Sequence, residues 1–391
     1  MKNCIEYILS KNAQRNIGLD VIRSFAILVT VYGHGVLLVS PNYRSIHNVF
    51  ISAFDGVSLF FVLSGYLIGG ILVNELSKNN FSIGQFWMRR WLRTLPAYFF
   101  TYLILILFAF GNGTFQLDYL KYLYFFQNLF GPAYFFFSES WSLSIEEWFY
   151  ILFPLVILVF LGYLKNIKRA LSITILLFFI GPILYTFYQY QNAIGLDDWD
   201  AHYRRIVATR LNSIALGILL VYLQKYVPNI WLKLEKKGMK LAVLCVILSF
   251  IIPKINFHTL VYNIFLRSHL ECLIAFFAIP YLTTIKELPY PFLTKWIRII
   301  SIISYSMYLI NLSFLLRNVL VPFQKTASFI ALGNLGYFLI YITYWVLLFI
   351  FSILMYRYIE FPFLKLRDNI KVKSLFKITE KQLTNINSTI N

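Results

Sequence analysis

The feature that most constrains the fold of this chain is a succession of long apolar runs along its 391 residues. An α-helix needs about 20 consecutive apolar residues to cross the hydrocarbon core of a bilayer. Runs close to this length fall at residues 19–39, 49–73, 95–111, 145–164, 170–190, 206–224, 241–257, 260–284, 299–320 and 333–356. A soluble domain has no place to bury so many runs. The sequence therefore predicts an all-α polytopic membrane protein with about ten transmembrane helices.

The charged residues indicate which side of the membrane each loop occupies. Only 13% of residues are charged, yet the formal net charge is +18. Such an excess can indicate nucleic-acid binding, but here most basic residues fall in segments on one side of the ten-helix topology. Cytoplasmic loops carry this kind of excess. We therefore expect both termini in the cytoplasm, the acidic turn at 197–200 outside, and no nucleic-acid partner.

The same topology divides the chain into three parts. We expect a cytoplasmic N-terminal segment at 1–16, a membrane domain at 17–367 and a cytoplasmic tail at 368–391. No small-residue cleavage site follows the first apolar run, so we expect it to remain as an anchor. Neither a disulfide framework nor a metal site is expected from the spacing of the cysteines, which are Cys4, Cys245 and Cys272.

Residues 119–137 do not fit this topology as a span. The segment is apolar enough to cross, but a full span there would place the basic cluster at 165–169 outside. We interpret it as a re-entrant or interfacial segment lining a cavity, because irregular backbone at membrane depth is tolerated only against protein or water. An eleventh span is the alternative.

The first run carries Asp20, Arg23 and His34 into a hydrophobic setting. Arg23 and His34 are about three helical turns apart, so their side chains lie on one stripe, about 16 Å apart along the axis. A lone buried histidine is usually structural, but ionisable groups within a membrane span are costly and commonly functional. Arg23 and His34 are therefore candidate catalytic residues, with Asp20 as the ion-pair partner of Arg23.

Two arginines lie one helical turn apart near the cytoplasmic end of the third run. They are Arg90 and Arg93, in the stretch MRRWLRTLP. Topogenic charge explains some arginines here, but it does not require two guanidinium groups on one helix face. Such a pair suits bidentate binding of phosphate, as in the diphosphate of a nucleotide-carrying donor. The sequence has no glycine-rich phosphate loop, so arginines would have to hold any phosphate.

The stretch SWSLSIEEWFYILFP places two adjacent carboxylates, Glu146 and Glu147, at the start of an apolar helix. Acidic residues are common in a first helical turn, so a structural role is one interpretation. The other is that one carboxylate lies at the edge of low dielectric, where its proton affinity is tuned. Neighbouring side chains are candidate supporting residues, namely Trp141, Ser142 and Tyr150.

Two further patterns indicate packing. Arg267 and Glu271 share a helix face and are expected to form a buried ion pair, with His269 pointing elsewhere. Close helix contact is expected at three small residues of the second run, which are Gly65, Gly69 and Gly70.

Four stretches in this order resemble the acyltransferase 3 family of multi-pass bacterial membrane acyltransferases. They are the Arg23–His34 spacing, GVSLFFVLSGYLI, the Arg-x-x-Arg of Arg90 and Arg93, and WSLSIEEWFYILFP. The resemblance covers roughly residues 17–367. It implies an enzyme of the bacterial cytoplasmic (inner) membrane that moves an acyl group, commonly acetyl from acetyl-CoA, to a hydroxyl of a surface glycan or lipid-linked glycan. Such acceptors include lipopolysaccharide O-antigen, capsule, exopolysaccharide and peptidoglycan.

The resemblance also implies roles for individual residues. Arg23 and His34 correspond to the essential pair, Arg90 and Arg93 to donor-side arginines, and Glu146 to the carboxylate of the WSLxxE motif. As a mechanistic hypothesis, His34 acts as general base toward the acceptor or carries the acyl group itself. Arg23 then stabilises the thioester oxyanion or holds the donor, and Glu146 orients the imidazole. Acetyl-CoA is expected as co-substrate, with no bound cofactor or metal.

The chain departs from the family pattern at three positions. Asn311 and Phe361 stand where many members have His and Arg, and Asn212 stands where some have Asp. We therefore expect no catalytic role for Asn311 or Phe361, and a structural role for Glu360. Two alternatives remain open at this point, an acyltransferase acting on a small molecule or amino sugar, and a transporter or flippase. A transporter would be expected to show inverted repeats, and none is evident.

Overall fold

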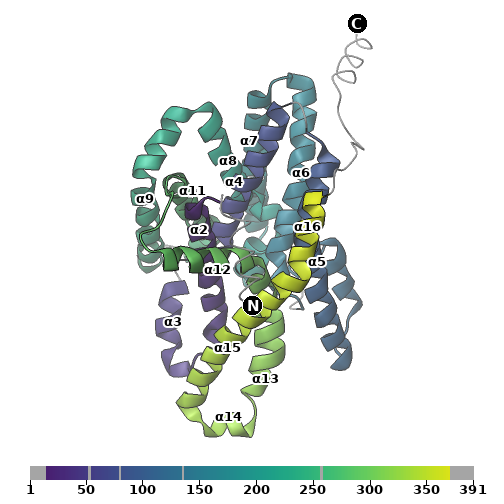
Figure 1. Cartoon of the computed structure of the whole chain (residues 1–391), viewed down its shortest axis with the longest axis vertical. Helices are drawn as coiled ribbons and strands as arrows, with labels where there is room; N and C mark the ends of the chain where they lie inside the picture. The colour runs from purple at the N-terminus through teal and green to yellow at the C-terminus, as the bar shows by residue number, and fades with distance from the viewer. Residues whose placement is uncertain (1–14, 52–53, 79–80, 134–135, 256–258, 370–391) are drawn as a thin grey trace.

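The computed structural model describes residues 15–51, 54–78, 81–133, 136–255 and 259–369. These residues form helices and connecting turns, with no β-strand among them (Figure 1). Most of the predicted N-terminal segment 1–16, nearly all of the tail 368–391, and Cys4 lie outside the described residues. The all-α prediction is confirmed.

Ten long helices make up the bundle within the described part of the chain. They are α2 (Ile17–His34), α4 (Gly56–Ser77), α5 (Ile83–Gly111), α6 (Ser140–Leu164), α7 (Ile167–Gln191), α8 (Val207–Tyr226), α9 (Pro228–Ile251), α11 (Ser268–Thr283), α12 (Pro291–Ile310) and α15 (Gly333–Met355). Short elements connect or extend them, namely η1 (Gly35–Leu38), η2 (Pro41–Tyr43), α3 (Arg44–Ile51), η3 (Leu117–Tyr124), η4 (Asp200–Arg204), η5 (Ile252–Lys254), α10 (Thr259–Val261), η6 (Tyr262–Arg267), η7 (Asn311–Leu320), α13 (Val321–Phe323), α14 (Ala327–Ala331), η8 (Tyr356–Glu360) and α16 (Phe361–Asn369).

Nine helical stretches of the described residues are long and apolar enough to cross a membrane. The protein is therefore a multi-pass membrane protein. Of the ten predicted spans, the one at 241–257 is not among these nine. It corresponds to the second half of α9, and the first half of that helix is charged and carries several lysines. That helix ends at Ile251 and packs against α11.

Some predicted boundaries change in the structure. The run at 49–73 is divided between the short helix α3 and the span α4, and residues 52–53 between them are not described. Helix α5 begins at Ile83, well before the predicted start at residue 95, so Arg90 and Arg93 lie on its first turns. Asp55 caps α4 because its Oδ1 accepts a hydrogen bond from the Val57 amide at 3.0 Å.

The segment 119–137 contains no long helix in its described residues. Its 3₁₀-helix η3 ends at Phe125, which has a left-handed conformation with φ of 59°. The Asn128 side chain then donates to the carbonyl oxygens of Trp141 at 2.9 Å and Arg205 at 2.6 Å. The backbone amides of Val207 and Ala208 donate to the carbonyl oxygens of Asn128 at 3.0 Å and Leu129 at 3.3 Å. These bonds satisfy irregular backbone against protein, as expected for a non-spanning segment, and the alternative of an eleventh span is not supported. Residues 134–135 lie outside the description.

Helices α4 and α8 approach closely through paired glycines. A Cβ at Gly65 would lie 2.0 Å from the Ile214 carbonyl oxygen, and one at Gly217 would lie 2.1 Å from that of Val62. The expected close contact is thus confirmed for Gly65, and also for Gly69, which faces Ile218. It is wrong for Gly70, which has no atom within 4 Å.

The span that begins with α12 changes direction where η7 starts. Asn311 opens η7, a π-helical segment, and π-helical turns are frequent at functional sites. In Figure 1, α12 lies across the view, whereas the chain leading to α13 runs toward the end of the molecule that holds α3 and α14. The bend brings Asn311 into the interior, where it is 0% exposed.

Candidate active site

Helix α4 passes three cavities in succession. The first, the basic cavity, is lined by Ile71, Asn74, Glu75, Lys78, Phe86, Arg89, Arg90, Arg93 and Arg367. The second, the middle cavity, is lined by Arg23, Val57, Phe60, Phe61, Leu63, Ser64, Leu67, Ile68, Arg90, Arg93, Thr94, Ser142, Leu143, Glu146, Tyr150, Ser304, Tyr305 and Tyr308. The third, the histidine cavity, is lined by Val29, Thr30, Gly33, His34, Phe54, Asp55, Gly56, Val57, Ser138, Glu139, Trp141, Trp199, Asp200, Arg204, Arg205, Arg267, Glu271, Tyr308 and Leu312.

Shared lining residues show that these cavities adjoin one another in a row. Arg90 and Arg93 line both the basic and the middle cavity, and Val57 and Tyr308 line both the middle and the histidine cavity. Along α4 the row extends from Gly56 to Lys78, which at 1.5 Å per residue is about 33 Å, close to the thickness of the hydrocarbon core. The row therefore follows the whole length of a membrane span.

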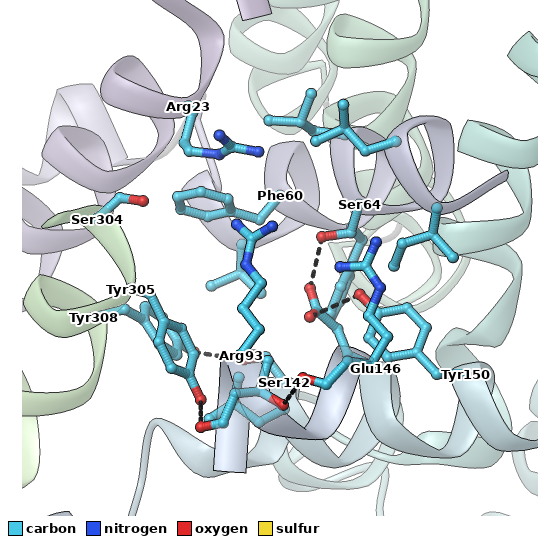
Figure 2. Close-up of a pocket in the computed structure, with 18 residues that line it drawn as sticks. Arg23, Phe60, Ser64, Arg93, Ser142, Glu146, Tyr150, Ser304, Tyr305 and Tyr308 are labelled. Atoms are coloured by element: carbon cyan, nitrogen blue, oxygen red, sulfur yellow. Dashed lines mark hydrogen bonds between the residues drawn. The ribbon is translucent and has the colours of Figure 1, made fainter. Parts of the chain in front are cut away.

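The middle cavity brings together residues from five helices, which are α2, α4, α5, α6 and α12. The guanidinium groups of Arg23 and Arg93 point into the same space beside Phe60 (Figure 2). Glu146 lies across this space and accepts hydrogen bonds from the hydroxyls of Ser64 and Tyr150, each at 3.0 Å. Arg23, Arg90, Arg93 and Glu146 therefore line one cavity, a convergence that the motifs did not predict, and the cavity suits an anionic or strongly polar ligand.

Glu147 and the arginines Arg90 and Arg93 have different surroundings in the structure. Glu147 turns away from the cavity and accepts a hydrogen bond from Thr94 at 2.9 Å. Arg90 lies over the Tyr150 ring, 5.6 Å from its centre. Among the described residues, neither Arg90 nor Arg93 forms an ion pair with a carboxylate. Both guanidinium groups are therefore available to a ligand.

The ion pair expected between Asp20 and Arg23 is present, but it is not the main contact of Asp20. The carboxylate is 3.9 Å from Arg23, whereas its closer partners are Arg15 at 2.6 Å and the Ser301 hydroxyl, also at 2.6 Å. An acceptor already bound by two closer donors holds Arg23 only weakly. Arg23 is consequently free to orient toward the middle cavity.

His34 lies in the histidine cavity, separate from Arg23. Its Nδ1 is hydrogen-bonded to Oδ1 of Asn311, and Nδ2 of Asn311 donates to the carbonyl oxygens of Met307 at 3.0 Å and Tyr308 at 2.5 Å. Since the amide nitrogen is committed to two acceptors, Asn311 presents its oxygen to the ring, and Nδ1 carries the proton. Nε2 of His34 is therefore the unprotonated nitrogen, and it has no partner among the residues the structure describes.

This arrangement corrects one expectation. Glu146 does not orient the imidazole, because it lies in the middle cavity and is bonded to Ser64 and Tyr150. Asn311, for which we expected no catalytic role, instead positions His34 by making the contact that fixes its tautomer. The sequence motifs do not predict this contact.

Glu139 is a residue of this cavity that the motif analysis missed. It precedes α6, is 1% exposed, and accepts hydrogen bonds from the Ser313 amide at 3.2 Å and the Ser313 hydroxyl at 2.5 Å. Burial raises the pKa of the Glu139 carboxyl to about 7, although the bonds from Ser313 act in the opposite direction. Glu139 thus anchors Ser313, which lies two residues after Asn311 in η7.

A network of ion pairs forms the far wall of the histidine cavity. Arg204 bridges Asp200 and Asp55, the latter at 3.3 Å, and lies over the Trp141 ring. Burial alone would raise the pKa of Asp200, but Arg204 and Arg205 outweigh it and lower the pKa to about 2. The charges of this wall are thereby largely balanced.

The packing pair expected on η6 and α11 is confirmed. Arg267 Nε lies 3.2 Å from Glu271 Oε1, and Glu271 is 2% exposed. His269 points elsewhere, to the Asn212 side chain at 2.9 Å. Glu360 is also buried and accepts a hydrogen bond from Ser306, consistent with a structural role.

A hydroxyl pair closes the passage between the middle and histidine cavities. The Tyr308 and Ser142 hydroxyls are 2.7 Å apart (Figure 2), and Tyr308 also donates to the Glu139 carbonyl oxygen at 2.8 Å. Ser142 and Tyr308 come from α6 and α12, so two helices hold this closure. Trp141, the neighbour of Ser142, faces the histidine cavity.

Comparison of the sequence with known families decides the identity of the domain. Residues 16–358 match the acyltransferase 3 model, described as an acyltransferase domain. The chain belongs to the acyltransferase 3 family.

Individual relatives match parts of this acyltransferase 3 domain. Peptidoglycan O-acetyltransferase OatA of Listeria monocytogenes is 32% identical over 178 residues, which is 40% of this chain and 26% of that protein. O-acetyltransferase OatA of Staphylococcus aureus is 29% identical over 231 residues, 53% of this chain and 34% of that protein. An uncharacterized protein of Haemophilus influenzae is 33% identical over 141 residues, 32% of this chain and 57% of that protein. The matches thus cover only part of each relative, and no solved structure matches the chain.

The acyltransferase 3 match does not include every residue of the three cavities. It contains Arg23, His34, Arg90, Arg93 and Glu146 but ends at residue 358. The final residue of the basic cavity, Arg367, lies beyond it. No group of three or more His, Cys, Asp or Glu side chains able to hold a metal occurs in the described ranges.

Proposed function

We propose that this chain is a membrane-bound O-acyltransferase that moves an acetyl group from acetyl-CoA to a hydroxyl of a cell-surface glycan. One observation carries the proposal, namely a row of cavities that has arginines without ion-pair partners at one end and His34, with a defined base nitrogen, at the other. The family and the O-acetyltransferase names of two partial relatives support the same reaction. We place the enzyme in the bacterial cytoplasmic membrane, with the basic cavity toward the cytoplasm.

The proposed reaction needs no external proton source. Nε2 of His34 takes the proton of the acceptor hydroxyl while the hydroxyl oxygen attacks the thioester carbonyl. The C–S bond of the tetrahedral intermediate breaks, and the imidazolium returns the proton to the departing thiolate of CoA. General-base assistance of this kind contributes roughly 10²–10⁴-fold.

Arg23 serves the donor in this proposal. It lines the middle cavity with Arg90 and Arg93, about three helical turns from His34. This position favours holding the donor over stabilising an oxyanion next to the histidine. The middle cavity, at about 100 Å³, is too small for a nucleotide.

The closure at Tyr308 and Ser142 leaves two routes for the acyl group. In direct transfer the closure opens and the thioester reaches the acceptor beside His34. In a relay, Nε2 of His34 first attacks the thioester carbonyl, CoA leaves as the thiol, and the acyl-imidazole then passes its acyl group to the acceptor. Both routes use the same nitrogen.

A sugar-containing acceptor fits the histidine cavity. The indole rings of Trp141 and Trp199 line it and offer flat surfaces for a sugar ring. The ion pairs of Arg204 and Arg267 balance the charges of the wall, which suits a neutral polyhydroxyl ligand. The relative named peptidoglycan O-acetyltransferase supports a glycan, and a small-molecule or amino-sugar acceptor is the alternative.

The proposed function is tested by comparing a strain that carries the gene with its deletion mutant. We expect NMR spectra of purified surface polysaccharide and peptidoglycan to lose O-acetyl signals in the deletion mutant, and a plasmid copy to restore them. The purified protein should release free CoA from acetyl-CoA when the affected glycan is added. Unchanged O-acetylation together with no CoA release would contradict the proposal, and glycan flipping without CoA release would favour a flippase.

The arginine pair provides a second test. Replacing Arg90 and Arg93 together by Ala should raise the KM for acetyl-CoA by roughly 100-fold or more, because each charged hydrogen bond to phosphate contributes about 1.5–3 kcal/mol. A matched control is Lys168→Ala with Arg169→Ala, a basic pair at the start of α7 that lines none of the three cavities. An unchanged KM in the Arg90 and Arg93 variant would remove these residues from the donor site.

A further inference from the structure

The basic cavity carries more positive charge than a diphosphate requires. Its lining includes five cationic side chains and one carboxylate, that of Glu75. The cations come from three helices and are Lys78, Arg89, Arg90, Arg93 and Arg367. Two of them, Arg90 and Arg93, also face the middle cavity, so three remain that face only the outer part of the row.

These three cations are not accounted for by ion pairs across the cavity. In the described ranges Lys78 and Arg89 form no ion pair within 4 Å, and Arg367 pairs only with its own neighbour Asp368, at 2.8 Å. Like charges held near one another repel, so their convergence costs stability unless an anion occupies the space. The positive-inside rule explains why basic residues occur in a loop. It does not explain why basic residues at the end of α4, in α5 and in α16 surround one cavity.

The C-terminal helix α16 has a defined place in this arrangement. It packs against α5, which brings Arg367 close enough for its charge to act on Arg93. Arg367 lies outside the part of the chain that matches the acyltransferase 3 family.

The order of the cavities matches the order of groups in a CoA thioester. From the acyl end, CoA consists of the pantetheine arm, the diphosphate and then a ribose bearing a 3′-phosphate. With the arm directed along the middle cavity toward His34, the diphosphate falls at Arg90 and Arg93, which line both the middle and the basic cavity. The basic cavity, at about 460 Å³, is large enough for a nucleotide. A phosphate monoester carries about −1.5 to −2 charges near neutral pH, so with the diphosphate the donor approaches −4.

We propose that Lys78, Arg89 and Arg367 form a subsite for a phosphate monoester, the 3′-phosphate of the CoA ribose. This inference rests on the proposed use of acetyl-CoA. It makes the enzyme selective for CoA over thioesters that lack the 3′-phosphate. The headgroup of an anionic lipid offers the same chemistry, and the test separates the two sources.

The test measures KM with two donors, acetyl-CoA and acetyl-3′-dephospho-CoA, using the purified full-length protein in a neutral detergent. We expect the wild-type KM to be roughly 10–100-fold higher for the dephospho donor, the range for loss of charged hydrogen bonds. Replacing Arg89 and Arg367 by Ala should raise the KM for acetyl-CoA by a similar factor and leave that for the dephospho donor unchanged. The control Arg357→Ala, at an exposed position outside all three cavities, should change neither.

Each other outcome has a definite meaning. Equal KM values for the two donors in an active wild-type enzyme would overturn the subsite while leaving the proposed function intact. No turnover with either donor would overturn the proposed function itself. If the double variant loses activity equally with both donors, and added phosphatidylglycerol changes the activity of the wild type only, the cations bind lipid and the subsite is wrong. Size-exclusion profiles and Tm values in detergent show whether each variant is folded.

Discussion

Replacing His34 by Gln should reduce acetyl transfer by roughly 10²–10⁴-fold, the usual contribution of a general base. Glutamine keeps a polar side chain of similar length, but its amide cannot take a proton from the acceptor hydroxyl at Nε2. The expected loss is in kcat, with little change in the KM for acetyl-CoA, because the donor-side arginines lie in a different cavity. Release of CoA from acetyl-CoA in the presence of acceptor measures both constants.

The matched control is His202→Gln. His202 lies against Gly195 and lines none of the three cavities, so its loss should leave kcat within about twofold. The His34 assignment fails if His34→Gln retains near-normal turnover while accumulating in membranes with the wild-type Tm. A labelled acetyl group trapped on the His34 ring after denaturation would establish the relay. Transfer at the full rate with no adduct at any time during turnover would favour the direct route.

Replacing Asn311 by Ala should lower kcat by roughly 10–100-fold, corresponding to the loss of one hydrogen bond that fixes the reactive tautomer. Without the Asn311 oxygen, the proton is no longer held on Nδ1, and the ring spends part of its time with Nε2 blocked. The KM for acetyl-CoA should not change. Asn311→His should restore much of the activity, because an imidazole can also accept from Nδ1 of His34.

A second Asn–His pair in the protein supplies the control for Asn311. Asn212 and His269 are hydrogen-bonded at 2.9 Å and line none of the cavities. Asn212→Ala should therefore cost stability, seen as a lower Tm, with kcat per folded molecule maintained. Equal losses of kcat in both variants, or an unchanged kcat in Asn311→Ala, would show that Asn311 has no specific effect on His34.

The sequence predicts most of the membrane-spanning helices because hydrophobic runs are local properties. Each span is visible as a stretch of apolar residues, and the deviations occur where a local rule is incomplete. The run at 241–257 misses the start of α9 because the first half of that helix is charged, yet the helix packs against α11. The convergence of Arg23 with Arg90 and Arg93 is not predicted, because it depends on how separate helices pack together.

The contacts of the histidine cavity could not be predicted in the same way. His34 and Asn311 are 277 positions apart in the chain, and only the bend at η7 brings the amide to the ring. Glu139 directly precedes α6 and Glu146 is seven residues further on, about 10 Å along the helix axis. That separation places them in different cavities, a distinction that the motif alone does not contain.

The hydroxyl pair of Tyr308 and Ser142 matters to the whole cell as well as to the reaction. A water-filled passage along this row would let protons and ions cross the bilayer, and each charge would dissipate about 2.3 kcal/mol per 100 mV of membrane potential. The hydroxyls lie 2.7 Å apart beside Val57, where the middle and histidine cavities adjoin. In the proposed reaction, with the donor entering from the basic cavity and the acceptor from the histidine cavity, this contact separates the two substrates and also limits the leakage of ions along the row.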